Sequence, residues 1–301
     1  MAIVLAGTWL QPCFTWGQSL ALIEAGTAPP RASTDPACCN ESVSGKSVRA
    51  ALGRVCLRER KNKESVSARK AIVIGFVGGF VSRDDIKHPE VQFAEVLRQA
   101  YPSTAHVEVF SNHDGKGALR RVLQLLDANN DGVLQDCEKQ RAAIVVYGHS
   151  WGASQTVTLA RQLERLQIPV LLTVQLDSVH KPGHKDAVIP SNVRNAVNFF
   201  QTNGVIHGRS QMSAEDPERT HIIGNFQMSY QGRRIDCNNY PWIARHLNRG
   251  HHQIENDPLV WEQVAFMIDL ELTKSTSADE TSAPPASSPR EESATLTSVK
   301  K

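Results

Sequence analysis

The sequence predicts an α/β protein in which a mostly parallel β-sheet is covered by helices on both faces. Short apolar runs typical of buried strands alternate along the chain with longer segments whose apolar residues recur at helical spacing. One of these strands also passes into a helix through a tight turn flanked by two glycines. Alternating strands and helices favour parallel pairing, because each crossover helix then covers a face of the sheet.

Composition divides the 301 residues into three parts. Residues 1–70 form an irregular N-terminal segment, 71–273 the α/β domain, and 274–301 a tail rich in Ser, Thr, Ala, Pro and charge that is expected to be disordered. Residues 1–22 are moderately apolar but lack a basic start, so they are either a degenerate signal peptide or an irregular N-terminus. Localisation therefore stays open between export and the cytoplasm.

Charge and hydropathy argue against two classes of partner. The formal net charge is only +2, which gives no reason to expect a nucleic acid or an anionic surface. No apolar run is long enough to cross a bilayer. The cysteines include no pair at zinc-finger spacing, so a thiolate metal site is not expected. Disulfide pairing and oligomeric state cannot be read from the sequence.

The first elements of the domain follow from local patterns. Residues 71–76 are β-branched and apolar and end in a glycine-rich loop, which indicates a buried strand. Apolar residues at roughly helical spacing predict a helix over 88–100, and Pro102 ends it. Residues 106–110 are the next expected strand, and leucines on one face predict a helix over 117–126.

The central elements come next along the chain. Residues 144–147 and 170–176 are continuous apolar runs, which is typical of strands buried on both faces. The helix between them is expected to run to about residue 166. Further strands are expected at 196–200 and 220–224.

The end of the domain is less regular. The segment 205–249 carries several aromatic residues and methionines, and it is either a small cap over the site or ordinary outer packing. A last helix begins at Asp257-Pro258, because proline suits the first helical turn and apolar residues follow at helical spacing.

The turn after the 144–147 strand has the pattern Gly-x-Ser-x-Gly. A bend of this kind lifts the hydroxyl of Ser150 clear of the sheet, and the first N–H groups of the following helix point at the same place. Gly148 and Gly152 are small because the helix passes close to the strand. A motif this short also occurs by chance, but the strand before it and the helix after it favour a nucleophile elbow.

A serine hydroxyl becomes a nucleophile only with a base in hydrogen-bond reach and a group that orients the base. Asp177 directly follows the 170–176 strand, at the edge of the sheet where sites collect. It is the leading candidate for the acid, the alternatives being an aspartate that caps a turn or Asp216 in its place. Among eleven histidines, His251 and His252 lie just before the last helix and give the chain order Ser, Asp, His.

From about Ala71 to Leu272 the chain resembles the α/β-hydrolase superfamily, in its lipase/esterase branch. The matching residues are Gly148-His149-Ser150-Trp151-Gly152 after one strand, Leu176-Asp177-Ser178 after the next, and His251 with Ile254, Asp257, Pro258 and Val260 before the terminal helix. The family's closing motif fits His251 better than His252, so the resemblance implies His251 as general base. Many members keep the acid one strand later, and the family's His-Gly oxyanion loop is replaced here by Ile74-Gly75-Phe76.

The resemblance implies hydrolysis of carboxylic esters through a Ser150-His251-Asp177 triad and an acyl-enzyme. The expected substrate is a small-molecule ester or lipid, with no cofactor required, and thioesters and amides stay open. A non-catalytic binding protein of the same fold is the alternative. The expected oxyanion donors are the N–H of Trp151 and that of Phe76 or Val77.

Residues 127–138 match the EF-hand calcium loop at every position that the pattern fixes. Oxygen donors occupy the first, third and fifth places, glycine the sixth and glutamate the twelfth. Only Lys139 to Arg141 separate this loop from the next strand, so the second helix of an EF-hand is almost absent. The loop is therefore a structural calcium clamp, an ordinary polar surface loop or, less in keeping with a single loop, a calcium-responsive module. The expected ligands are Asp127, Asn129, Asp131, Val133 and Glu138.

Overall fold

The computed structural model describes the backbone of residues 70–282 and the side chains of residues 70–274. The apolar segment 1–22 and the last part of the expected tail, 283–301, lie outside the described residues. Within residues 70–274 there are two cysteines, Cys137 and Cys237, and both are free thiols.

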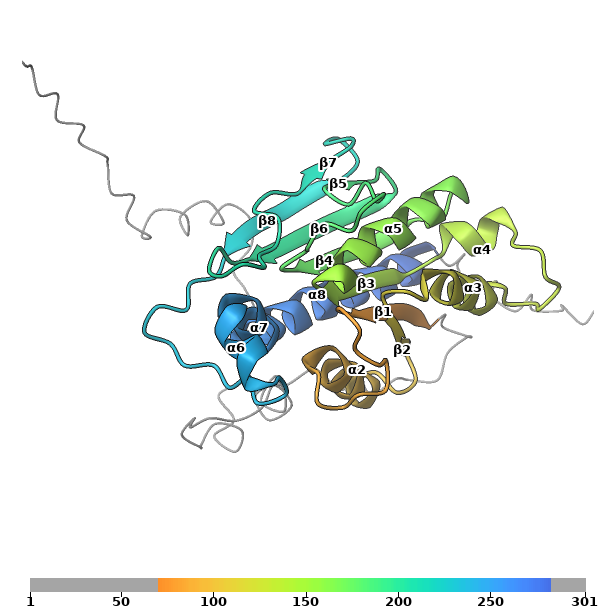
Figure 1. Cartoon of the computed structure of the whole chain (residues 1–301). Helices are drawn as coiled ribbons and strands as arrows, with labels where there is room; N and C mark the ends of the chain where they lie inside the picture. Colours follow the sequence, from red (N-terminus) through yellow and green to blue (C-terminus); the bar gives the residue numbers. More distant parts are fainter. Residues whose placement is uncertain (1–69, 283–301) are drawn as a thin grey trace, which may run out of the picture. The chain divides into compact units, whose positions relative to one another are not determined.

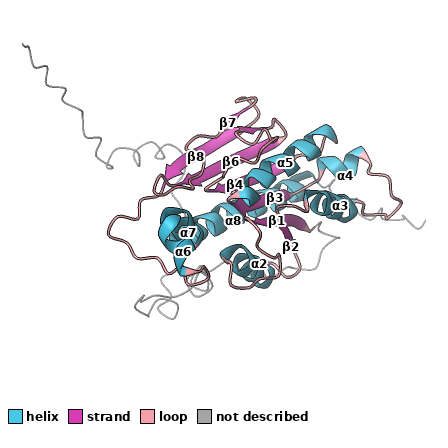
Figure 2. Ribbon diagram, in the orientation of Figure 1, coloured by secondary structure: helices cyan, strands magenta, loops and turns pink. Residues whose placement is uncertain are grey.

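Six parallel strands form the main sheet, in the order β2-β1-β3-β4-β6-β8 (Figures 1 and 2). From β1 the chain adds β2 on one side and then returns to place β3 on the other. The strand order thus reverses between β1 and β3, and ligand sites in such sheets lie at the carboxyl ends of the strands at this switch point. The strands are β1 (Ala71–Val77), β2 (Ala105–Ser111), β3 (Ile144–His149), β4 (Val170–Leu176), β6 (Val193–Phe200) and β8 (His221–Gln227).

Helices cover both faces of the sheet. On one face pack α2 (Pro89–Ala100) and the long α8 (Pro258–Ser282), and on the other α3 (Gly115–Leu126) and α5 (Trp151–Arg165). Figure 1 shows α3 and α5 in front of the strands and α8 behind them. The short elements are α4 (Asp136–Gln140), α6 (Trp242–Leu247), α7 (Arg249–Glu255), β5 (Val188–Ile189) and β7 (Ser213–Ala214).

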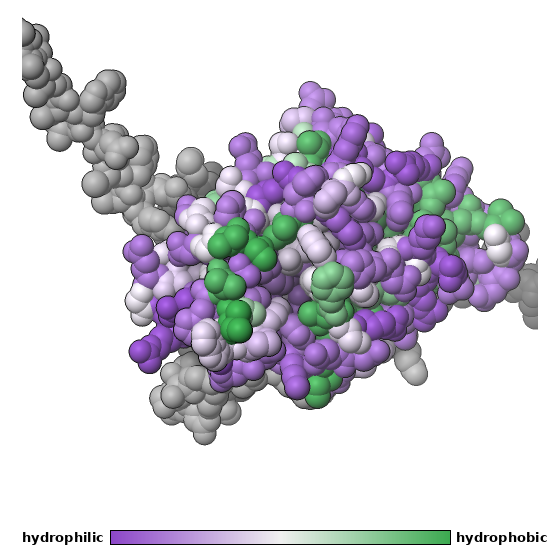
Figure 3. Space-filling view, in the orientation of Figure 1, coloured by the Kyte–Doolittle hydropathy of each residue, from purple (hydrophilic) through white to green (hydrophobic). Residues whose placement is uncertain are grey.

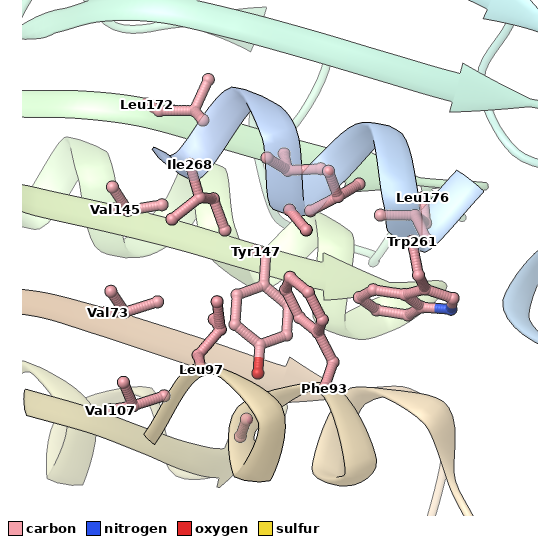
Figure 4. Close-up of a cluster of buried hydrophobic side chains, with 14 of the residues drawn as sticks. Val73, Phe93, Leu97, Val107, Val145, Tyr147, Leu172, Leu176, Trp261 and Ile268 are labelled. Atoms are coloured by element: carbon pink, nitrogen blue, oxygen red, sulfur yellow. The ribbon is translucent and has the colours of Figure 1, made fainter. Parts of the chain in front are cut away.

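Two hydrophobic cores lie on the two faces, because successive strand residues point in opposite directions. Val73 and Val145 face α2 and α8, and their neighbours Ile72 and Ile144 face α3 and α5. The first core is anchored by aromatic rings from three elements, which Figure 4 shows in contact. The Phe93 centroid lies 5.2 Å from that of Tyr147 and 4.9 Å from that of Trp261.

The predicted fold class, a mostly parallel sheet with helices on both faces, is confirmed. The expected strands and helices of the domain are present, with end points shifted by a few residues. The segment 205–249 contains the edge strand β8 as well as α6 and β7. Helix α8 continues to Ser282, past the expected start of the tail at 274, because extending an existing helix needs no new nucleation.

No helix in the described part of the chain is both long enough and apolar enough to span a membrane.

Candidate active site

Ser150 lies in the turn that joins β3 to α5. Its backbone has φ 58° and ψ −123°, outside the regions that L residues normally occupy. Glycines on both sides make the turn possible, because a Cβ on Gly148 would lie 2.6 Å from the backbone of Gly152. A Cβ on Gly152 would in turn overlap the carbonyl group of Phe76. The structure therefore has the sharp strand-to-helix bend that the Gly-x-Ser-x-Gly pattern predicts.

His251 approaches this serine from α7. Its Nε2 atom lies 3.0 Å from Ser150 Oγ, and its Nδ1 atom lies 2.6 Å from Asp177 Oδ2. If Nδ1 carries the proton toward the carboxylate, Nε2 is free to accept the proton of the serine hydroxyl. A Cβ on Gly250 would lie 2.5 Å from the carbonyl oxygen of Asn203, so glycine at this position allows α7 to pack closely.

Asp177 is fixed at the end of β4 by several donors. Its Oδ1 accepts hydrogen bonds from the backbone N–H of Gly208 at 2.7 Å and of Gln201 at 3.2 Å. Its Oδ2 accepts one from the side-chain amide of Gln201 at 2.8 Å, beside the bond to His251. The residue is fully buried and has φ 45°. A buried carboxylate with this many donors is held in one orientation.

The structure thus brings together the three residues that the sequence singled out as a triad. They come from the ends of the adjacent strands β3 and β4 and from α7, which lies about 100 residues beyond Ser150 in the chain. Hydroxyl, imidazole and carboxylate are hydrogen-bonded in series. Such a series can move a proton from the serine to the imidazole and stabilise the resulting cation.

The residues expected to supply the oxyanion donors lie at the start of α5 and at the end of β1. Trp151 is the first residue of α5, where N–H groups have no acceptor inside the helix. Phe76 and Val77 are fully buried residues of β1. The following residue approaches the nucleophile most closely, since a Cβ on Gly78 would lie 3.0 Å from the Cβ of Ser150. Gly78 is therefore a further candidate for the second donor, which the sequence reasoning missed.

The alternates lie away from the serine hydroxyl. The ring of His252 packs at a tilt against Tyr240 with centroids 3.7 Å apart, and neither of its nitrogens has a hydrogen-bond partner in the described part of the chain. Asp216 lies just before β8, hence near the amino end of the sheet, where its carboxylate accepts a hydrogen bond from the N–H of Glu218. Neither residue contributes to the hydrogen-bonded series at Ser150.

Exposed apolar side chains lie next to Trp151 and before α7. Phe80 is 89 % exposed, and its ring packs edge-on against Trp151 with centroids 5.8 Å apart. Val205 and Leu247 are also exposed, near the N-terminal side of α7. Green, apolar areas are visible on the face of the molecule shown in Figure 3. Exposed apolar groups of this kind suit an apolar ligand better than a charged one.

The calcium-like loop connects α3 to α4. The carboxylate of Asp127 accepts hydrogen bonds from the N–H groups of Asp131 and Gly132, and Gly132 has φ 79°. Glu138 closes the loop by accepting from the N–H groups of Ala128 and Gln135. The carboxyl groups therefore converge on the loop's own backbone, and the expected second helix is the five-residue α4.

Three residues that orient the triad carry no motif in the sequence. Gln201 and Gly208 hold the carboxylate, and Gly250 lets α7 approach. A Cβ on Gly208 would lie 2.6 Å from the Cα of Asp177. The only sequence signal for Gln201 is a polar residue directly after a strand, which many turns share.

Comparisons with known proteins find only distant structural similarity. No protein-family model matches this sequence, and no curated protein sequence does. Among solved structures, a cutinase-like protein from Cryptococcus sp. is 13 % identical with a TM-score of 0.37, over 69 % of this chain and 98 % of that one. RedJ, solved with a PEG molecule in its active site, is 8 % identical with a TM-score of 0.36, over 72 % of this chain and 97 % of RedJ.

Because both TM-scores lie below 0.5, the fold class of this chain is assigned from its own strand order and from the turn at Ser150. The chain has an α/β fold built on a parallel six-stranded sheet, in which a strained strand–turn–helix junction at Ser150 joins β3 to α5. A fold of this kind supports many activities, so the chemistry has to be argued from the site.

Proposed function

We propose that this protein is a serine hydrolase that cleaves carboxylic esters through an acyl-enzyme. The observation that carries the proposal is the pair of hydrogen bonds made by His251, 3.0 Å to Ser150 Oγ and 2.6 Å to Asp177 Oδ2. A serine next to a base, and a base oriented by a buried carboxylate, is the arrangement that acyl transfer needs.

In the proposed reaction Ser150 attacks the ester carbonyl while His251 takes the serine proton. Asp177 stabilises the imidazolium, and the oxyanion accepts hydrogen bonds from the N–H of Trp151 and from a second N–H in or just after β1. His251 returns the proton to the leaving alcohol, which departs and leaves the acyl group on Ser150. A water molecule, deprotonated by His251, then releases the acid by the same steps.

The proposed substrate is an ester or lipid with an apolar acyl group. Exposed Phe80 supports this, because its ring packs against Trp151, next to the nucleophile, and offers apolar surface there. A series of p-nitrophenyl esters of increasing acyl length tests the proposal. We expect kcat/KM to rise with chain length, whereas a preference for acetate would contradict the apolar acyl site.

The direct test of the enzyme class is labelling with a fluorophosphonate probe, followed by peptide mapping. We expect one labelled serine, Ser150, and a fall of roughly 10⁶-fold in the rate of ester hydrolysis for Ser150→Ala. Ser213→Ala, at an exposed serine on β7, is the matched control and should keep both labelling and activity. Absence of labelling in the folded wild-type protein would favour a non-catalytic binding protein instead.

We further propose that residues 127–138 bind calcium as a structural clamp. Support comes from the donors Asp127, Asn129, Asp131 and Glu138, which line one loop in the order a calcium loop requires. A calcium ion there would tie α3 to α4, just before the strand that leads to Ser150.

A further inference from the structure

A second group of ionisable side chains, which the proposed reaction does not use, adjoins the candidate triad, since the ring of His149 packs against that of His251. His88 precedes α2, Glu90 lies in its first turn, His149 ends β3, and Glu255 ends α7. All four are buried, with exposed fractions of 6 %, 1 %, 2 % and 0 %. Burying two carboxyl groups and two imidazoles together is costly unless their charges are compensated.

Potential ligand atoms converge in this group. One atom each from His88, Glu90 and Glu255 lies within 4.8 Å of the others. His88 Nδ1 is 2.9 Å from Glu255 Oε1. His149 Nδ1 points at the same carboxyl groups, 3.6 Å from Glu90 Oε1 and 3.8 Å from Glu255 Oε2.

The charge of the two glutamates is not balanced by a fixed cation. Within the described part of the chain, the ion pairs made by Glu90 and Glu255 are all with histidines. The Oε2 atom of Glu90 is buried without a hydrogen-bond partner there. Two carboxylates buried this close together, with no fixed cation beside them among residues 70–274, are unfavourable. Either a shared proton or a metal ion would relieve this.

We propose that His88, Glu90 and Glu255 bind one divalent transition-metal ion, with Zn²⁺ as the first candidate and His149 within reach as a fourth ligand. Imidazole nitrogen and carboxylate oxygen together suit zinc, which binds both at about 2.0–2.2 Å. A metal ion would also supply the missing partner of Glu90 Oε2. Small rotations of the glutamate side chains would draw the three ligand atoms inward.

Outer contacts of the kind found around metal sites are present. The second nitrogen of His88 lies 3.8 Å from Asp85 Oδ2, and Tyr240 donates a hydrogen bond of 2.5 Å to Glu255 Oε2. Partners of this kind fix the orientation of a ligating histidine or carboxylate.

The metal ion would join α2 and α7, with β3 as a third attachment if His149 takes part. Glu255 lies four residues after His251 on α7, one turn along the same side of the helix. Fixing Glu255 would therefore fix the helix that carries the imidazole, without the metal touching substrate. The metal ion is a positioning element in this proposal.

The test begins with the full-length protein purified without a polyhistidine tag. Elemental analysis should find about one equivalent of zinc or another divalent transition metal per chain. Stripping it with 1,10-phenanthroline should lower Tm, and added Zn²⁺ should restore it. Co²⁺ in its place should give the visible absorption bands of a four-coordinate nitrogen–oxygen site. A protein that is metal-free and whose Tm does not respond to Zn²⁺ or Co²⁺ would overturn the proposal in favour of a shared proton.

Variants locate the site on the chain. Glu90→Gln and His88→Ala should lower Zn²⁺ affinity by at least about 100-fold, because each removes a ligand rather than an outer contact. Glu108→Gln is the matched control, since Glu108 pairs with His106 on β2 but lies outside the group. Full metal content in folded Glu90→Gln and His88→Ala would place the metal elsewhere and refute this site. These measurements do not depend on hydrolysis, so the metal proposal and the proposed function can fail separately.

Discussion

At the residue scale, two strained positions aim their side chains at one point. Ser150 and Asp177 both have positive φ, and each directly follows one of two adjacent strands. Non-glycine residues in such conformations cost about 1–3 kcal/mol each unless surrounding contacts compensate. The N–H of Ser150 donates to Leu176 O, and the N–H of Asp177 donates to Phe199 O, so both bends are held by the neighbouring strand. Strain therefore coincides with the proposed chemistry.

The role of Asp177 gives the first prediction at this scale. Asp177→Asn keeps the shape of the side chain but favours the wrong tautomer of His251, so kcat for ester hydrolysis should fall by about 10⁴-fold. Steady-state kinetics with p-nitrophenyl esters measure this. Asp216→Asn should leave kcat unchanged, because Asp216 lies by the start of β8. The reverse pattern would transfer the acid role to Asp216.

Asp186 gives a prediction about stability and pH. Burial alone would raise its pKa, but hydrogen bonds from Ser154, the N–H of Lys181, His180 and Arg209 outweigh burial and lower the pKa. A lowered folded-state pKa stabilises the protein above the unfolded pKa, near 4, and this gain is lost as pH falls through the folded value.

We expect Asp186→Asn to lower the free energy of unfolding by about 1–3 kcal/mol at pH 7. The difference from wild type should begin to shrink below about pH 4, where the unfolded chain takes up a proton at this position before the native carboxylate does. Urea denaturation at pH 7, 5 and 3.5 checks both statements. A difference that grows on acidification would contradict the assigned direction of the pKa.

Sequence reasoning at this scale reached the residues with motifs and missed those without. The role of Ser150 could be predicted from the glycines at positions 148 and 152, and that of His251 from its position just before the last helix. The roles of Gln201 and Gly208 could not be predicted, because these residues reach Asp177 only after the chain beyond β6 has folded back onto it. A hydrogen bond across 24 residues of sequence leaves no local pattern.

At the element scale, periodic segments were predictable and α7 was not. Strands such as β4 are continuous apolar runs, and α2 repeats apolar residues at helical spacing. Helix α7 is only seven residues long, and its sequence RGHHQIE has a single aliphatic residue. Its position is decided by tertiary contacts such as Gly250 against Asn203, which outweigh local propensity.

The proposed calcium clamp is tested at this scale as well. If residues 127–138 bind Ca²⁺, saturating calcium should raise Tm relative to EGTA by several degrees, since a ligand that binds only the folded state stabilises it by RT ln(1 + [L]/Kd). Asp131→Asn removes one charge from the loop and should reduce this shift. Calorimetry gives the stoichiometry. Equal melting curves in calcium and EGTA would make this a polar surface loop.

At the scale of the whole molecule, the central part of the sheet joins the two cores and the site. The carboxyl ends of β3 and β4 carry Ser150 and Asp177, and the opposite faces of the same strands carry the apolar layers. The α/β class was readable because alternating strands and helices permit few other layered packings. The structure of the segment 205–249 could not be predicted, since its aromatic content fits a cap and a sheet edge equally well.

Trp261 connects the core to the site, and it gives the last prediction. Its ring is fully buried on α8 against Phe93 and Tyr147 (Figure 4). Its Nε1 donates a hydrogen bond of 2.6 Å to the backbone carbonyl of Glu255. Trp261→Ala should lower the free energy of unfolding by about 3–5 kcal/mol, because it leaves a large cavity between α8 and the sheet. Chemical denaturation followed by circular dichroism measures the loss.

Phe266→Ala is the matched control on the same helix. Phe266 is 60 % exposed, so its truncation should change stability by no more than about 0.5 kcal/mol. Trp261→Phe separates the two roles of the indole, since it fills most of the cavity but cannot donate to Glu255 O. If the hydrogen bond positions α7, Trp261→Phe should lower kcat for ester hydrolysis by more than its small loss of stability explains, with KM little changed. If kcat is unchanged in the folded variant, the indole acts through packing alone.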